Sequence, residues 1–183
     1  MNIQATELTE LYIIQSSPYA DDRGAFSRLF CGDALSTMLE GRSIAQINHS
    51  STNDIGAIRG LHAQKSPSAE MKIVRCLKGR VFDVAVDLRA DSSTFLQWHG
   101  EELTPENNKA LLIPEGFAHG FQVLDADSEL LYLHTEFYHP EQEVGVRYDD
   151  PSIAIDWPLA VSTVSEKDKC SPYINESFRG LKV

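Results

Sequence analysis

The feature that most constrains this chain is a set of short segments in which more hydrophobic and more polar residues alternate. In the clearest segment one set of positions alternates with a more hydrophobic set: Val81, Asp83, Ala85 and Asp87 against Phe82, Val84, Val86 and Leu88. A period of two residues is that of a β-strand, whose side chains point alternately to opposite faces. The apolar segment Met71 to Cys76 precedes it across Leu77-Lys78-Gly79-Arg80, a turn sequence. The two segments together predict a β-hairpin.

Similar segments continue through the middle of the chain, whereas helical patterns are scarce. Further strands are predicted at Phe95 to Leu103, Ala110 to Ile113, Ala118 to Leu124 and Glu129 to Tyr138. Pro114-Glu115-Gly116 and Asp125-Ala126-Asp127 supply breaks between them. Short helices are predicted at Gly32 to Leu39 and after Pro158. About six to ten strands with few helices predict an all-β sandwich or barrel, a set to which the jelly roll belongs.

Length and charge limit the class of protein further. A chain of 183 residues fits one domain, residues 1–183, with a sizeable core. The formal net charge of −11 argues against nucleic-acid partners and anionic membranes, since both require a basic surface. An acidic protein binds a diphosphate only through a few locally placed cations.

Cysteine usage and the N-terminal sequence indicate the compartment. Cys31, Cys76 and Cys170 have no CxxC spacing, so neither a disulfide framework nor a zinc knuckle is predicted. The first fifteen residues contain no basic stretch followed by an apolar run, and no apolar run is long enough for a membrane span. We therefore expect a cytoplasmic protein.

Polar residues interrupt the apolar strands in four motifs: DDRGAF at 21–26, RGLHAQ at 59–64, PEGFAHGF at 114–121 and SEKD at 165–168. Each motif alone has an ordinary structural explanation. Arg-Gly pairs occur in turns, a histidine on a strand is often a hydrogen-bonded core residue, and a Lys-Asp pair is often a solvated face. No single motif therefore defines a function.

Taken together, the motifs resemble those of the dTDP-4-dehydrorhamnose 3,5-epimerase family, jelly-roll enzymes of the cupin class. The matching sequences run in family order from about residue 20 to residue 170: DDRG, RGLH, KIVRCLKGRVFDVAVDLR, PEGFAHGF, LLYLHTEFYHPEQE, YDDPSIAIDWP and SEKD. The resemblance implies an all-β jelly-roll (cupin) β-sandwich with short peripheral helices. It also implies an isomerase that inverts C3 and/or C5 of a nucleotide-linked 4-keto-6-deoxyhexose, with no cofactor and no metal.

Epimerisation beside a ketone requires a base on one face of the sugar, an acid on the other, and a donor for the enolate oxygen. The resemblance assigns the base to His62 and its orienting carboxylate to Asp168. It assigns the acid to Tyr132 and the cation at the enolate oxygen to Lys72. These types suit the roles, because a neutral imidazole is a usable base at pH 7 and an ammonium is a compact charge for an oxyanion.

The resemblance implies a second set of residues that bind the substrate: Arg23, Phe26, Arg28, Gln46, Asn48, Arg59, His119, Tyr138 and Lys167. Arg23 and Arg59 match positions that hold the diphosphate, where a guanidinium fork suits paired phosphate oxygens. Phe26 and Tyr138 match aromatic positions at the nucleotide base and sugar, where stacking is favourable. Plain core packing explains Phe26 equally well.

The chain departs from the family at three positions near these residues. Arg28 replaces a usual Glu, Ala63 a usual Phe or Tyr, and Ile47 a usual Asp. A carboxylate accepts from the N3–H of thymine, whereas an arginine only donates and suits the acceptors of cytosine. Arg28 therefore suggests a CDP-sugar, unless it points to solvent or pairs with an acidic neighbour.

Several alternatives remain open. A metal-dependent cupin is disfavoured, because Gln64 stands two residues after His62 where a second histidine ligand is needed, and the other histidines lack ligand spacing. A non-catalytic nucleotide-sugar-binding cupin, a single-site 3- or 5-epimerase and a 3,4-ketoisomerase also fit the fold. Tyr132 favours epimerisation, since proton delivery from the opposite face is what inverts a centre. By resemblance we expect a homodimer with exchanged N-terminal strands.

Overall fold

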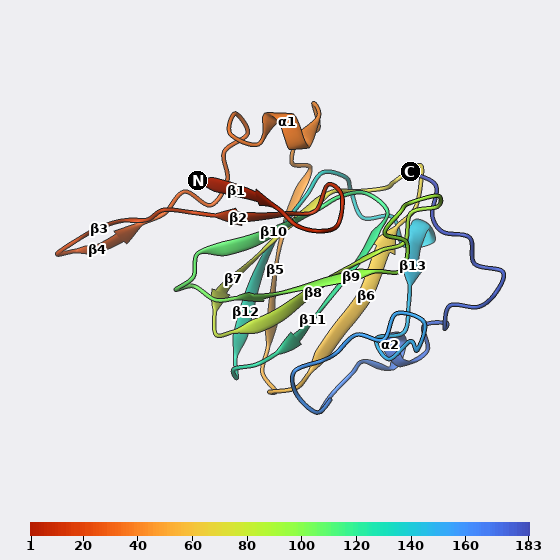
Figure 1. Ribbon diagram of the computed structural model, residues 1–183. Helices are drawn as coiled ribbons and strands as arrows, with labels where there is room; N and C mark the ends of the chain where they lie inside the picture. Colours follow the sequence, from red (N-terminus) through yellow and green to blue (C-terminus); the bar gives the residue numbers. More distant parts are fainter.

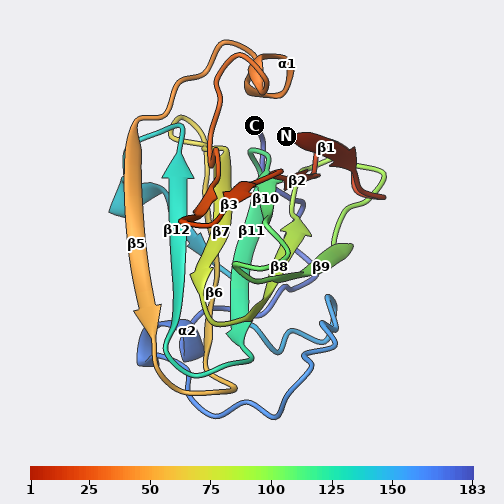
Figure 2. The same cartoon turned by 90° about the vertical axis from the view of Figure 1, so that its left-hand side faces the viewer.

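The computed structural model describes residues 1–183 and consists mainly of two antiparallel sheets packed face to face (Figures 1 and 2). The six-stranded sheet has the order β1 (Asn2–Ala5), β2 (Tyr12–Gln15), β10 (Lys109–Ile113), β7 (Lys72–Lys78), β12 (Ser128–His134) and β5 (Gln46–Thr52). The five-stranded sheet has the order β13 (Glu143–Gly145), β6 (Ile58–Gln64), β11 (Phe117–Val123), β8 (Val81–Asp87) and β9 (Trp98–Leu103). The predicted all-β jelly-roll sandwich is confirmed.

Peripheral elements are few and short, as predicted. They are the hairpin β3 (Tyr19–Asp21) and β4 (Gly24–Phe26), the helices α1 (Ser36–Leu39) and α2 (Glu166–Lys169), and the 3-10 turn η1 (Pro140–Gln142). The helix expected at Gly32 to Leu39 is confirmed only in its second half. The helix expected after Pro158 is α2. No helix is long and apolar enough to cross a membrane.

Two of the predicted strands are shorter than expected. The strand predicted from Phe95 begins at Trp98, because Ser92 and Thr94 donate hydroxyl hydrogen bonds of 2.6 and 2.7 Å to Asp87 Oδ2 and hold the preceding residues in a turn. The strand predicted from Glu129 to Tyr138 spans Ser128–His134 instead. The chain then turns away through a backbone hydrogen bond of 3.0 Å from Thr135 to the Met71 carbonyl.

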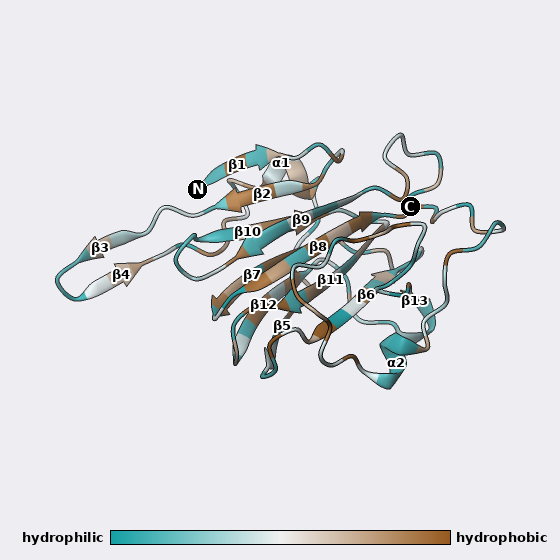
Figure 3. Cartoon of the chain, turned by 60° about the horizontal axis from the view of Figure 1, so that its bottom comes forward, coloured by the Kyte–Doolittle hydropathy of each residue, from teal (hydrophilic) through white to brown (hydrophobic).

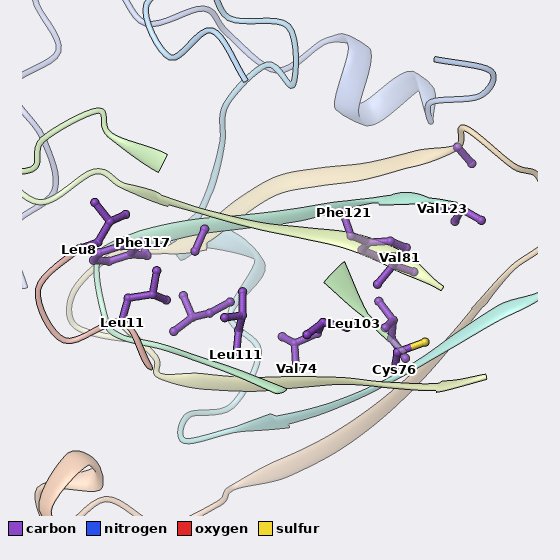
Figure 4. Close-up of a cluster of buried hydrophobic side chains, with 14 residues drawn as sticks. Leu8, Leu11, Val74, Cys76, Val81, Leu103, Leu111, Phe117, Phe121 and Val123 are labelled. Carbon is purple, nitrogen blue, oxygen red and sulfur yellow. The ribbon is translucent and has the colours of Figure 1, made fainter. Parts of the chain in front are cut away.

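Both sheets bury side chains on both faces. Between the sheets lies a cluster that includes Val74, Leu111 and Phe117 (Figure 4). The outer face of the five-stranded sheet is covered by the C-terminal segment, whose Ile153 packs beside Val84. Figure 3 shows hydrophobic stretches along β7 and β8, in contrast to the hydrophilic α2. Packing on both faces therefore makes the central strands apolar almost throughout.

The alternation in β8 has a consequence for the space between the sheets. Its strongly apolar positions, such as Val84 and Val86, face outward beneath the C-terminal segment. The other set, with Val81 and Ala85, belongs to the cluster between the sheets. Asp83, which lies between Val81 and Ala85 on the same face, is fully buried and bonded to a histidine inside the sandwich. The sandwich interior is thus hydrophobic at one part and polar at another.

Candidate active site

A cavity of about 620 Å³ opens between the two sheets at this polar part. Strands β5, β7 and β12 supply one wall, β6 and β11 supply the other, and β13 and the α2 region border it. Nine of the thirteen predicted site residues line it: Asn48, Arg59, His62, Lys72, His119, Tyr132, Tyr138, Lys167 and Asp168. The fold therefore gathers residues 120 positions apart in sequence (48 and 168) into one cavity.

His62 and Asp168 form a hydrogen-bonded pair on the β6 side. His62 Nε2 lies 2.7 Å from Asp168 Oδ1, and the Gly60 backbone N–H donates to Oδ2 at 3.2 Å. Burial raises the pKa of Asp168, but the hydrogen bonds from His62 and Gly60 outweigh it and leave the pKa below its ordinary value. An ionised Asp168 makes Nε2 the donor, so the neutral ring keeps its lone pair on Nδ1. Nδ1 is then the basic atom of the pair.

The short helix α2 fixes the position of Asp168. Ser165 is its N-cap, and the Ser165 hydroxyl oxygen accepts from the Asp168 backbone N–H at 3.1 Å. A serine at this position satisfies an otherwise unpaired donor of the first turn. The SEKD motif therefore both starts the helix and aims its aspartate at β6.

His119 lies directly beside His62, because the two residues are register partners on β11 and β6. Its Nε2 lies 2.7 Å from Oδ1 of Asp83, which is fully buried. The other oxygen of Asp83 has no hydrogen-bond partner. The His119 ring meets the ring of Tyr132 edge-on at 6.1 Å between centroids.

Tyr132 approaches the cavity from the six-stranded sheet, opposite His62. Its hydroxyl lies 3.1 Å from the Ser50 hydroxyl on the neighbouring strand β5. Burial raises the pKa of Tyr132 well above its ordinary value, and the Ser50 hydrogen bond offsets only part of that rise. Tyr132 is therefore a neutral phenol at physiological pH, with a proton to donate.

Lys72 lies on the same wall as Tyr132 and is paired with an acidic neighbour. Its Nζ is 3.0 Å from Glu70 Oε1, and both side chains are 8% exposed. The second oxygen of Glu70 lies 2.9 Å from His134 Nδ1. The lysine is thus a buried cation held at a defined place in the cavity wall.

The mouth of the cavity carries a second ionic cluster, around Glu143 on β13. Lys167 Nζ lies 2.6 Å from Glu143 Oε1, and the Tyr138 hydroxyl donates to Oε2 at 2.6 Å. The same carboxylate is 3.9 Å from His62 Nε2. Burial raises the pKa of Glu143, but Lys167 and Tyr138 hold it below its ordinary value. An ionised Glu143 therefore holds the Tyr138 and Lys167 side chains together next to His62.

Arg59 and Asn48 also line the cavity, whereas Gln46 does not. The Arg59 guanidinium donates to Thr52 Oγ1 at 2.8 Å and to the Ser51 carbonyl at 3.1 Å, and it has no carboxylate partner. Gln46 instead accepts from the Tyr138 backbone N–H at 3.0 Å. Gln46 therefore meets the cavity lining indirectly, through this bond to Tyr138 and its strand pairing with His134.

The family follows from comparison with known proteins. The family model described as dTDP-4-dehydrorhamnose 3,5-epimerase matches residues 5–176. The dTDP-4-dehydrorhamnose 3,5-epimerase of Escherichia coli K12 is 42% identical over 181 residues, which are 98% of this chain and 97% of that protein. The chain belongs to the dTDP-4-dehydrorhamnose 3,5-epimerase family.

Solved structures of epimerases share the fold over nearly the whole chain. The dTDP-6-deoxy-D-glucose-3,5-epimerase of Legionella pneumophila, in complex with dTDP-4-keto-L-rhamnose, is 42% identical with a TM-score of 0.89, covering 94% of this chain and 92% of that one. The dTDP-4-dehydrorhamnose 3,5-epimerase of Bacillus anthracis, with TDP and pyrophosphate bound, is 37% identical with a TM-score of 0.90, covering 94% and 99%. The likeness therefore extends over more than nine tenths of the chain, 94% in each comparison.

Three substrate-binding residues predicted from this family lie away from the cavity of their own chain. Arg23, Phe26 and Arg28 sit on or just after the hairpin β3–β4, which projects from the sandwich (Figure 1). The Arg23 side chain is 90% exposed and forms its hydrogen bonds with Asp21, and Phe26 is 72% exposed. Arg28 approaches Cys31 Sγ at 3.9 Å and no carboxylate. The single chain thus does not bring these residues to the epimerase cavity.

Other residues of the epimerase cavity were not predicted. Glu70, His134, Glu143 and Ser50 all line it and contact predicted residues. His134 stands two positions after Tyr132 on β12, and this spacing places both side chains on one face of the strand. Within the chain, no group of three or more His, Cys, Asp or Glu side chains has the arrangement of a metal site.

Proposed function

We propose that this chain is a nucleotide-diphosphate-4-keto-6-deoxyhexose epimerase that converts dTDP-4-keto-6-deoxyglucose to dTDP-4-dehydrorhamnose by inverting C3 and C5 through an enolate. Family membership makes it an isomerase. The observation that carries the mechanism is that His62 on β6 and Tyr132 on β12 come from opposite sheets to one cavity. A sugar between them presents one face to a base and the other to an acid.

His62 starts the reaction. The C–H bond next to the ketone breaks, Nδ1 takes the proton, and the electron pair moves through the carbonyl carbon onto oxygen as an enolate. Asp168 stabilises the resulting imidazolium through its 2.7 Å hydrogen bond to Nε2. A charged hydrogen bond of this kind is about twice as strong as a neutral one, so Asp168 also holds the ring in place while the enolate forms.

Lys72 and Tyr132 complete the inversion. The Lys72 ammonium lies in the wall beside the acid and stabilises negative charge on the enolate oxygen. Tyr132 then donates its proton to the carbon from the opposite face, which inverts the centre. Solvent returns a proton to Tyr132 and takes one from His62. C3 and C5 flank the same ketone, so one set of groups serves both positions.

Binding of the diphosphate uses Arg59 and Lys167 from one chain and the β3–β4 hairpin from a partner in a homodimer. The hairpin leaves Tyr19 82% and Phe26 72% exposed. An isolated two-stranded hairpin is marginally stable in water, which supports a partner chain that covers it. Arg23 and Phe26 would then reach the neighbouring cavity. A preference of Arg28 for a CDP-sugar stays a separate prediction.

The compartment and the domain organisation belong to the same proposal. Cys31, Cys76 and Cys170 are unpaired thiols, as suits the reducing cytoplasm. We place the enzyme there, with residues 1–183 as one domain. Hydrophobic clusters on both faces of β7 and β10 support one continuous core.

Deuterium entry from D₂O tests the mechanism. The protein is incubated with dTDP-4-keto-6-deoxyglucose, and the label at C3 and C5 is followed by NMR, with the CDP-linked sugar as a parallel sample. We expect label at both carbons, and a loss of about 10²–10⁴-fold in His62→Ala. Label at one carbon would indicate a single-site epimerase. No label with either sugar, or an unchanged rate in His62→Ala, would refute the proposal.

A further inference from the structure

Glu70 connects two nitrogen-bearing side chains in the cavity wall opposite His62. Its Oε1 lies 3.0 Å from Lys72 Nζ, and its Oε2 lies 2.9 Å from His134 Nδ1. All three residues line the cavity. The Glu70 and Lys72 side chains are each only 8% exposed. The cluster is therefore a buried pair at the substrate site and not a solvated surface ion pair, which would contribute little.

The backbone holds these side chains on one face. Glu70 precedes β7 by two residues and Lys72 begins it, so both point to the same side. His134 is the register partner of Lys72 on β12. The Met71 N–H donates to Thr135 Oγ1 at 2.9 Å, and the Thr135 N–H donates to the Met71 carbonyl at 3.0 Å. The two strands are thus fixed to each other at the residues that flank the cluster.

The charges in the cluster are defined by its contacts. Burial raises the pKa of Glu70, but the hydrogen bond from His134 and the charge of Lys72 outweigh it and leave the pKa below its ordinary value. An ionised Glu70 accepts from both neighbours, so His134 carries a hydrogen on Nδ1. Its Nε2 lies 3.4 Å from Asn48 Nδ2. A buried ammonium needs an anionic partner, and Glu70 is that partner for Lys72.

We propose that Glu70 is a positioning residue for proton transfer, which holds the Lys72 ammonium where the enolate oxygen forms and orients the His134 ring beside it. Two bonds from one carboxylate restrict both side chains before substrate arrives. Stabilisation of an oxyanion depends on donors that are already in place when the charge develops. The inference rests on the proposed function, because Lys72 acts on an enolate only in that reaction.

The test compares Glu70→Ala and Glu70→Gln with a matched control. Glu101 is bonded to Lys109 at 2.7 Å and lies 3.8 Å from His99, so it forms a similar trio outside the cavity. Glu70→Gln keeps an oxygen for Lys72 but places an amide N–H against His134 Nδ1. We expect kcat for deuterium entry to fall about tenfold or more in Glu70→Ala and by less in Glu70→Gln. KM should stay within about threefold, since the affected charge appears only on the way to the enolate, and Glu101→Gln should match wild type.

A second measurement is independent of turnover. The ¹⁵N shifts of His134 should show a protonated Nδ1 in the wild-type protein and a protonated Nε2 in Glu70→Gln. The inference is overturned if both Glu70 variants keep kcat within about twofold of wild type, if only KM changes, or if Glu70→Gln leaves the His134 tautomer unchanged. A wild-type protein that exchanges no deuterium would refute the proposed function itself. Exchange in the wild type with normal Glu70 variants would refute only the role of Glu70.

Discussion

Asp168 shows how one side chain sets the chemistry of another. It is 3% exposed and accepts hydrogen bonds from His62 Nε2 and the Gly60 N–H. An asparagine at this position presents either an oxygen of lower charge or an N–H to the imidazole. In the second case Nε2 becomes the acceptor and Nδ1 carries the hydrogen, so the basic lone pair no longer lies where the reaction needs it.

We therefore expect Asp168→Asn to lower kcat for deuterium entry by about 10²-fold or more while the protein remains folded. Steady-state kinetics and circular dichroism of the variant check this. Lys169→Gln is the control, because Lys169 pairs with Glu166 on the outer side of the same helix at 2.8 Å. An unchanged kcat in Asp168→Asn would show that the carboxylate is not needed for His62 to act as the base.

The pH dependence of stability has a defined sign at the same residue. The folded-state pKa of Asp168 is below its ordinary value, so its contribution to the free energy of unfolding is present above about pH 4 and is lost as the pH falls through the folded-state pKa. Urea unfolding of the wild-type protein and Asp168→Asn between about pH 7 and pH 3 measures it. The difference in stability should be constant near neutrality and shrink at the acidic end. A difference that grows toward low pH contradicts the assignment.

Most cavity residues could be predicted because their motifs are long and ordered along the chain. Glu70 and His134 could not, because each is an ordinary polar residue at the edge of an apolar strand until the register of β7 and β12 is known. The placement of Arg23 and Phe26 is a different case. Their sequence motif indicates binding, but a single chain leaves them exposed.

At the scale of the element, the contact between β6 and β11 places the two cavity histidines side by side. The strands pack closely at Gly60 and Gly120, because a Cβ on Gly60 would lie 2.7 Å from the Gly120 Cα. A Cβ on Gly120 would lie 2.7 Å from the Arg59 carbonyl oxygen and 2.7 Å from Leu61 Cδ2. One of these neighbours is backbone, so the strands must separate to admit a methyl group.

We expect Gly120→Ala to lower the free energy of unfolding by about 1–3 kcal/mol and to reduce kcat, because β6 carries Arg59 and His62. Thermal unfolding and the deuterium assay measure the two effects. Gly32→Ala is the control, since a Cβ there meets only Phe30, at 3.8 Å. If Gly120→Ala unfolds like the wild type, the close approach does not define the position of β6.

The elements predicted from sequence are those with a hydrophobic alternation or continuous apolar runs, and β7 to β12 were all found, with shifted ends. Strands β5 and β6 were not predicted. Their sequences, QINHSST and IRGLHAQ, carry polar residues at positions that line the cavity, and only Leu61 and Ala63 of these two strands belong to a hydrophobic core cluster with their neighbours. The residues that give the site its chemistry thus remove the hydrophobic pattern by which a strand is recognised.

At the scale of the whole molecule, the projecting hairpin and the cavity define a test of shared sites. If the hairpin serves the partner's cavity, the double variant Arg23→Ala/Phe26→Ala damages the part of the site that its hairpin supplies to the partner. The variant His62→Ala instead lacks the base in its own cavity. We expect a co-expressed mixture of the two to recover roughly a quarter of wild-type activity, because half of the dimers are mixed and each mixed dimer has one intact site. Each variant alone should be far less active.

Light scattering of the purified protein should give twice the chain mass of 20.4 kDa. A monomer, or a mixture no more active than the average of the two variants, would place the hairpin outside the catalytic site. Arg80→Ala is a suitable control variant for the mixing experiment, since Arg80 does not line the cavity and its contacts with Glu102 and Asp125 lie on the surface.

The paired lysines of the cavity also determine which anions the empty enzyme attracts. Lys72 and Lys167 already have Glu70 and Glu143 at 3.0 and 2.6 Å. At these two lysines a free phosphate or sulfate ion meets a positive charge that a carboxylate already balances. Arg59, which has no carboxylate partner, is left to attract an anion into the cavity. The internal pairing thus leaves a small inorganic anion with fewer cations to bind than the cavity contains.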